Sequence, residues 1–140
     1  MVIELSLLMP GIIAVLIFII YTGFYYHDRS VIENVAYSSV LKCGSGYLYD
    51  NKNISVVCDD KEYENAVINR FYESIYGRVV GKWNLDSRAY VNNNSISINV
   101  NGYMEWPGGL ILEYLGGHLF KLSINESAMK IYEPNYIRRK

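Results

Sequence analysis

The residues able to do acid–base or metal chemistry are few in this 140-residue chain. Its imidazoles are His27, at the end of a long apolar run, and His118, which follows two glycines without a Cys, Asp or His at ligand spacing. Catalysis needs a nucleophile, a base and a group that orients them, and a metal site needs clustered ligands. We therefore predict a non-enzymatic protein with no catalytic residue, no metal site and no cofactor.

The two cysteines, Cys43 and Cys58, allow a different kind of chemistry. A bond between them would close a loop of about 15 residues and stabilise the fold by about 3 kcal/mol. Such a bond would favour an extracytoplasmic domain. The alternative is two unrelated thiols, because spacing alone does not show that the sulfur atoms meet.

Binding of nucleotides or nucleic acids is not indicated. The glycine pairs at 108–109 and 116–117 lack the Lys-Ser/Thr that follows in a phosphate-binding loop. The net charge is −1, and no basic cluster is interleaved with aromatic residues, as a nucleic-acid-binding protein would require. We therefore expect no nucleic-acid partner.

A carboxylate, Glu4, stands directly before the most apolar part of the chain. Residues 5–26 carry no charge and, as a helix, would extend about 33 Å, enough to cross a hydrocarbon core of about 30 Å. Tyr21, Tyr25 and Tyr26 at the far end fit the aromatic belt of a membrane interface. We predict a single membrane span over 5–26, with the lipid bilayer as a partner.

The helix is expected to continue beyond the membrane, because apolar and small residues recur at three- and four-residue spacing over 31–40. Gly44 and Gly46 end this pattern. The predicted helix therefore covers 1–43. Its first half is apolar all round, and its amphipathic second half would pack on the folded domain or on a neighbouring subunit.

Residues 44–140 are predicted to form a second, extracytoplasmic domain. Its first elements are a hairpin of 46–50 and 54–58 around Asn51-Lys52-Asn53, and a helix that begins with the capping box of Asp59 and Glu62 and ends at Tyr76. Strands are expected at 85–91, 95–101, 120–124 and 128–132, and 95–101 alternates strictly between polar and apolar residues. The expected fold class is α+β, with a long N-terminal helix and one further helix on an antiparallel sheet of about three to five strands.

A carboxylate at the margin of a span is useful when it has a partner. In a stack of identical helices, Glu4 can neutralise the α-amino group of a neighbour that is shifted along the axis. This contact would pair both charges and set the axial register. The physical role that we expect for Glu4 is therefore assembly.

The string Glu4-Leu5-Ser6-Leu7-Leu8-Met9-Pro10 resembles the start of TadE-like proteins, pseudopilin-type minor components of the tight adherence (Tad, or Flp) pilus. Glu4, Ser6, Leu7 and Pro10 match that family's pattern. The stretches 26–29 (Tyr-His-Asp-Arg) and 134–138 (Pro-Asn-Tyr-Ile-Arg) look like those of Gram-positive members, whereas the middle of the chain is unspecific. The resemblance implies that Pro10 bends or loosens the helix so that subunits can leave the bilayer. The alternative is an ordinary interfacial acid and an ordinary membrane-helix proline.

The resemblance also bears on orientation. Family precursors carry a short basic leader ending in Gly, and no such leader precedes Glu4. Either the leader lies outside this sequence, or Met1 is an artificial start, or this member is not processed. Arg29 and Lys42 follow the span and would place the domain in the cytoplasm, although Asp28 would neutralise Arg29 locally. A basic leader would instead hold the N-terminus inside and the domain outside.

We therefore expect a minor pseudopilin that is single-pass in a bacterial cell membrane, has its C-terminal domain outside and takes part in assembling a Tad/Flp pilus. The partners implied are other pilins or pseudopilins of the same system, membrane platform proteins and, if a leader exists, a prepilin peptidase. The alternative is a membrane-tethered binding or sensor domain whose helix only anchors it. A membrane-attached enzyme is a third class, for which the sequence has no convincing catalytic set.

Overall fold

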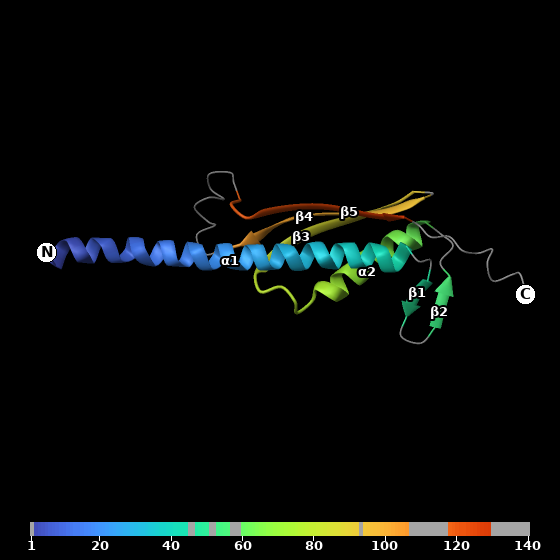
Figure 1. Cartoon of the computed structure of the whole chain (residues 1–140), viewed down its shortest axis with the longest axis horizontal. Coiled ribbons are helices and arrows are strands. Elements are labelled where there is room, and N and C mark those ends of the chain that lie inside the picture. Colours follow the sequence, from blue (N-terminus) through green and yellow to red (C-terminus); the bar gives the residue numbers. More distant parts are fainter. Residues whose placement is uncertain are drawn as a thin grey trace, which may run out of the picture.

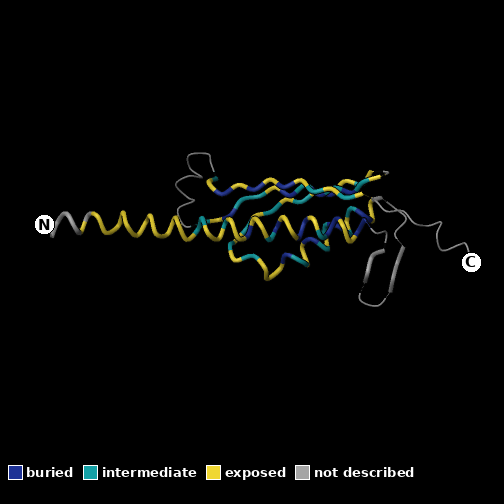
Figure 2. The backbone as a smooth tube through the Cα atoms, viewed as in Figure 1, coloured by how far each residue is buried: buried dark blue, intermediate teal, exposed yellow. Residues whose placement is uncertain are grey.

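A computed structural model describes the backbone of residues 2–44, 47–50, 53–56, 60–92, 94–106 and 118–129, and the side chains of 6, 8–44, 61–92, 94–106 and 118–129. Its dominant element is one continuous helix, α1 (Val2–Gly44), whose first half projects beyond the described part of the domain (Figure 1). The side chains at 8–20 are exposed (Figure 2). Further along, buried residues recur at helical spacing: Ile32, Val35, Ala36, Ser39, Val40 and Cys43. Of the two packing partners expected for the amphipathic half, the folded domain and a neighbouring subunit, the structure shows the domain.

The central sheet is antiparallel, with strand order β3 (Lys82–Val91), β4 (Ser95–Glu105) and β5 (Lys121–Met129). A tight turn joins β3 to β4, and in it the Asn92 N–H donates to the Ser95 carbonyl at 2.8 Å. The alternation predicted for 95–101 is present in β4, where Ile96, Ile98 and Val100 are fully buried on one face of the sheet.

The end of β5 corrects the sequence prediction. A separate strand was expected at 128–132, but Ala128 and Met129 are the last residues of β5, and the rest of that range lies outside the described residues. Asn125 and Ser127 point outward and Glu126 inward, in register with Asn99, Ser97 and Ile98 of β4. Pairing with β4 therefore carries the strand through a polar segment that the hydrophobic pattern alone divides in two.

The remaining elements match their predicted types. The helix α2 (Asp60–Ile75) buries one residue per turn, namely Tyr63, Val67, Phe71 and Ile75. It is followed by Gly77 at a φ of 75°, a left-handed conformation that glycine adopts without strain at a helix end. The predicted hairpin is formed by β1 (Tyr47–Asp50) and β2 (Asn53–Val56), which pair antiparallel in a sheet of their own.

Both helices cover the same face of the central sheet. The helix α1 contacts β4 and β5, and α2 contacts α1 and β3. Buried side chains from both helices and from the inner face of the sheet form one hydrophobic core. The other face of the sheet carries mostly exposed polar side chains. The fold is therefore α+β, as predicted, and its core holds the second half of α1 while the first half stays outside.

Candidate functional site

The two residues predicted to act in assembly lie on the projecting half of α1. Glu4 is in its first turns, and its side chain lies outside the described residues. Pro10 is inside the helix and exposed, and the helix continues through it. Because proline has no N–H, the carbonyl of Ser6, four residues earlier, receives no helical hydrogen bond at this position.

The surface around Pro10 is apolar on every side. The large hydrophobic residues between Leu8 and Ile20 are 40–62% exposed: Leu8, Met9, Ile12, Ile13, Val15, Leu16, Ile17, Phe18, Ile19 and Ile20. By length and composition, α1 qualifies as a membrane-crossing helix. A helix that is apolar all round is stable only in apolar surroundings, either lipid or other helices of the same kind.

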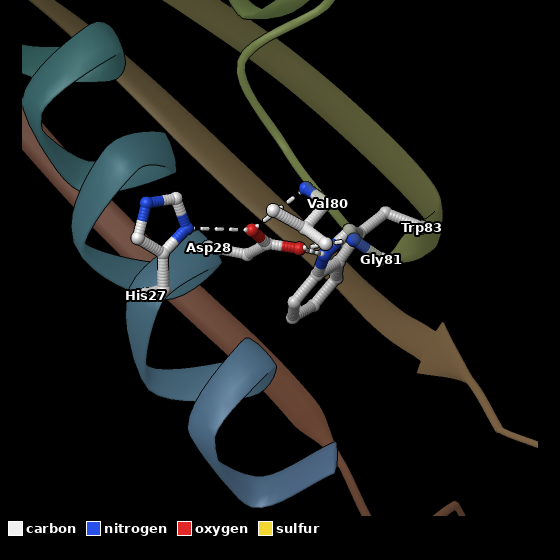
Figure 3. Close-up of polar contacts among 5 residues, drawn as sticks. All are labelled: His27, Asp28, Val80, Gly81 and Trp83. Carbon is white, nitrogen blue, oxygen red and sulfur yellow. Dashed lines mark hydrogen bonds and ion pairs between the residues drawn. The ribbon is translucent and has the colours of Figure 1, made fainter. Parts of the chain in front are cut away.

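The junction between this apolar half and the domain is built around a buried carboxylate. Asp28 has no exposed surface, and three groups of the domain donate hydrogen bonds to it (Figure 3). The Val80 N–H donates to Oδ1 at 2.9 Å, and the Gly81 N–H and the Trp83 indole donate to Oδ2 at 2.7 and 2.8 Å. We call Asp28, Val80, Gly81 and Trp83 the Asp28 clamp.

The charge of Asp28 is compatible with its burial because of these donors. Burial alone would raise the pKa of the Asp28 carboxyl, but the hydrogen bonds from Val80, His27, Trp83 and Gly81 together hold that pKa below its usual value. The half-exposed His27 takes part with its Nδ1 3.0 Å from the Asp28 Oδ1. Asp28 is thus an ionised group that fixes α1 to the segment between α2 and β3.

Gly81 fits this clamp because it has no side chain. A Cβ at this position would lie 2.6 Å from the Met104 sulfur and 3.0 Å from the Asp28 Oδ2. A Cβ contact of 2.6 Å does not occur without displacement of the neighbour, and one of 3.0 Å is tighter than most Cβ contacts in proteins. A side chain at position 81 would therefore have to displace the flexible end of Met104 and would press on the Asp28 carboxylate.

A cluster of aromatic rings lies on the N-terminal side of the Asp28 clamp, toward the apolar half of α1. Tyr25 of α1 lies against Trp83 and Phe120, with ring centroids 5.9 and 5.3 Å away, and its hydroxyl donates to the Lys121 carbonyl at 2.7 Å. Closer to the N-terminus, Phe18 lies 6.2 Å from Phe120 and Tyr21 lies 6.4 Å from Trp106. The domain therefore contacts α1 along residues that the sequence analysis places inside the membrane span.

The open face of the sheet carries a shallow groove of about 580 Å³. Polar side chains border it, but most of the surface that its lining exposes is apolar; the lining residues are Asn84, Asp86, Asn101, Gly102, Tyr103, Lys121, Leu122 and Ser123. His118 stacks on Tyr103 at 3.8 Å beside this face. Within the described ranges, no three His, Cys, Asp or Glu residues gather as they would around a metal ion.

The cysteine pair stays a prediction. Cys43 is buried near the end of α1, and burial raises the pKa of its thiol, although the charge and hydrogen bond of Arg70 act in the opposite direction. Cys58 lies outside the described residues.

Sequence reasoning missed the Asp28 clamp. Asp28 was expected to neutralise its neighbour Arg29, but its hydrogen-bond partners in the described structure are His27 and the three clamp residues far along the chain. A signal was present in the sequence, since Asp28 is the first charge after the apolar run. Its partners could not be predicted from the sequence, because two of them donate through backbone N–H groups, which do not depend on residue type.

Comparison with protein-family models, with curated proteins and with solved structures finds no match to this chain.

Proposed function

We propose that this protein is a non-enzymatic, single-span minor pseudopilin of the TadE-like type, anchored in a bacterial membrane with its domain outside, that takes part in assembling a Tad/Flp pilus through its N-terminal helix. The observation that carries the proposal is the division of α1 into an exposed apolar half and a half built into the core. A helix divided in this way can contact lipid or the helices of neighbouring subunits along its first half, while its second half is rigidly attached to the domain. The start of the sequence, from Glu4 to Pro10, supports the same reading.

In this proposal, Glu4 is the charge partner of a neighbouring subunit and Pro10 loosens the helix for exit from the bilayer. The test is Glu4→Gln, which keeps size and hydrogen bonding but removes the charge. We expect pilus yield to fall about tenfold at equal protein level, because loss of a charge pair worth ~1.4 kcal/mol changes an equilibrium constant by that factor.

Glu33→Gln is the matched control, since Glu33 is an exposed acid on the second half of the same helix. It should assemble as the unmodified protein does. Normal pilus yield from Glu4→Gln at equal protein level would remove the role that we assign to Glu4.

The groove on the open sheet face favours a second candidate, a membrane-tethered binding domain. This reading treats the helix as an anchor only, so any apolar span should replace it without loss. The exchange is best restricted to 5–17, because Phe18, Tyr21 and Tyr25 contact the domain. Full function after this exchange supports the tether, and loss of assembly with normal membrane insertion supports the pseudopilin.

A further inference from the structure

We propose that the end of the sheet nearest the span enters the membrane interface, so that the domain itself contacts lipid. We call Trp106, Leu119, Phe120 and Lys121 the membrane tip; they lie at the end of β4 and the start of β5. The inference rests on the proposed membrane anchoring and adds to it a second lipid contact, made by the domain.

The depth of the tip follows from its contacts with α1. If Glu4 marks one boundary of the hydrocarbon core, a thickness of ~30 Å covers ~20 helical residues and ends near Phe24. Phe18 then lies ~9 Å inside the far boundary, and Tyr21 lies ~4.5 Å inside it. Because Phe120 contacts Phe18 and Trp106 contacts Tyr21, the tip reaches the same levels. Interfacial elements of membrane proteins sit ~5–10 Å deep, which matches this range.

Contacts with α1 hold the tip against the helix, so insertion of the helix carries the tip toward the membrane. The hydroxyl of Tyr25 donates to the Lys121 carbonyl at 2.7 Å, and the ring of Tyr25 lies 5.3 Å from that of Phe120. The Asp28 clamp fixes the neighbouring start of β3 to the same helix. Insertion of α1 to the depth set by Glu4 therefore brings the tip with it.

The chemistry of the tip suits a lipid interface better than water. Leu119 is 48% exposed beside two aromatic rings, and Lys121 is an exposed cation at the same end of the sheet, where Lys82 is paired with Glu105 at 2.8 Å. Aromatic rings and basic side chains together are typical of the headgroup region. The occupant that we assign to this surface is therefore the bilayer.

The experiment measures tryptophan quenching in the full chain, reconstituted at high dilution in phosphatidylcholine vesicles with bromine atoms on the acyl chains near the headgroups. The chain has two tryptophans, so comparison with Trp106→Phe isolates the emission of Trp106. Among the described residues the Trp106 indole N–H has no acceptor, so this substitution breaks no described hydrogen bond. We expect loss of most Trp106 emission and a smaller loss of the emission of Trp83, which remains in the variant and lies against Tyr25, near the boundary of the hydrocarbon core.

Leu119→Glu and Met129→Glu form a matched pair, since both residues are exposed and apolar and flank opposite ends of β5. We expect Leu119→Glu to relieve the quenching of Trp106 and Met129→Glu to leave it unchanged. Quenching that is absent, or that survives Leu119→Glu undiminished, overturns the inference. Flotation of the protein with the vesicles at alkaline pH reports the anchor separately, so failure to float would count against the proposed anchoring, and failure of quenching in floating protein only against the tip.

Discussion

At the scale of single residues, Asp28 explains how the long apolar helix is fixed to the domain that follows. A buried carboxylate is costly unless it is hydrogen-bonded, and Asp28 is met by two backbone N–H groups and an indole from another part of the chain. The carboxylate in return gives each of these three donors an acceptor. These hydrogen bonds therefore fix both the level along α1 at which the domain is attached and the side of α1 on which it lies.

Asp28→Asn tests the clamp with almost no change of shape. The amide nitrogen would face N–H donors and leave at least one of them without an acceptor, so we expect the free energy of unfolding to fall by about 2–4 kcal/mol. The measurement is urea unfolding in detergent micelles at neutral pH. Asp86→Asn, at an exposed side chain, is the control and should change stability by less than about 0.5 kcal/mol.

The pH dependence gives a second readout of the same group. Because the pKa of Asp28 is lower in the folded state than the ordinary value of 3.8, its contribution is present above that value and is lost as the pH falls through the folded-state pKa. The stability difference between the unmodified chain and Asp28→Asn should therefore shrink in strong acid. A difference that is constant down to about pH 2 would contradict ionisation of Asp28 in the fold.

At the scale of elements, α1 combines two environments in one helix, and a matched pair of substitutions separates them. Ile32 is fully buried and Leu41 is 46% exposed. Ile32→Ala leaves a cavity in the core and should lower the free energy of unfolding by about 2–4 kcal/mol, whereas Leu41→Ala should cost less than about 1 kcal/mol. Equal losses from the two variants, measured by chemical unfolding, would show that this half of α1 does not enter the core in solution.

The elements were predictable from the sequence where their signal is local. The helical spacing in α1 and α2 and the alternation in β4 depend on residues within one element, and each was predicted with the correct type. The continuation of β5 through Asn125, Glu126 and Ser127 was not, because pairing with β4 decides it. The Asp28 clamp was missed for the same reason, since its donors come from residues 80–83 and are fixed by tertiary packing.

At the scale of the whole molecule, the side of the membrane that holds the domain is open to direct test. We expect the domain outside, so protease added to spheroplasts should remove it, while inside-out vesicles should protect it because protease does not cross a bilayer. A cytoplasmic enzyme that stays intact in the spheroplasts is the control. Cleavage in the inside-out vesicles alone would put the domain in the cytoplasm.

A helix made in one piece transmits rotation as well as displacement. If a neighbouring chain contacts the apolar half of α1 one residue further along, α1 is displaced along its axis by only ~1.5 Å. The side of α1 that faces the neighbour, however, turns about the axis by ~100°. The sheet turns by the same angle, because the Asp28 clamp and the contacts of Tyr25 prevent the sheet from rotating relative to α1. The axial displacement between neighbouring apolar halves thus determines the direction in which the polar face of the sheet points.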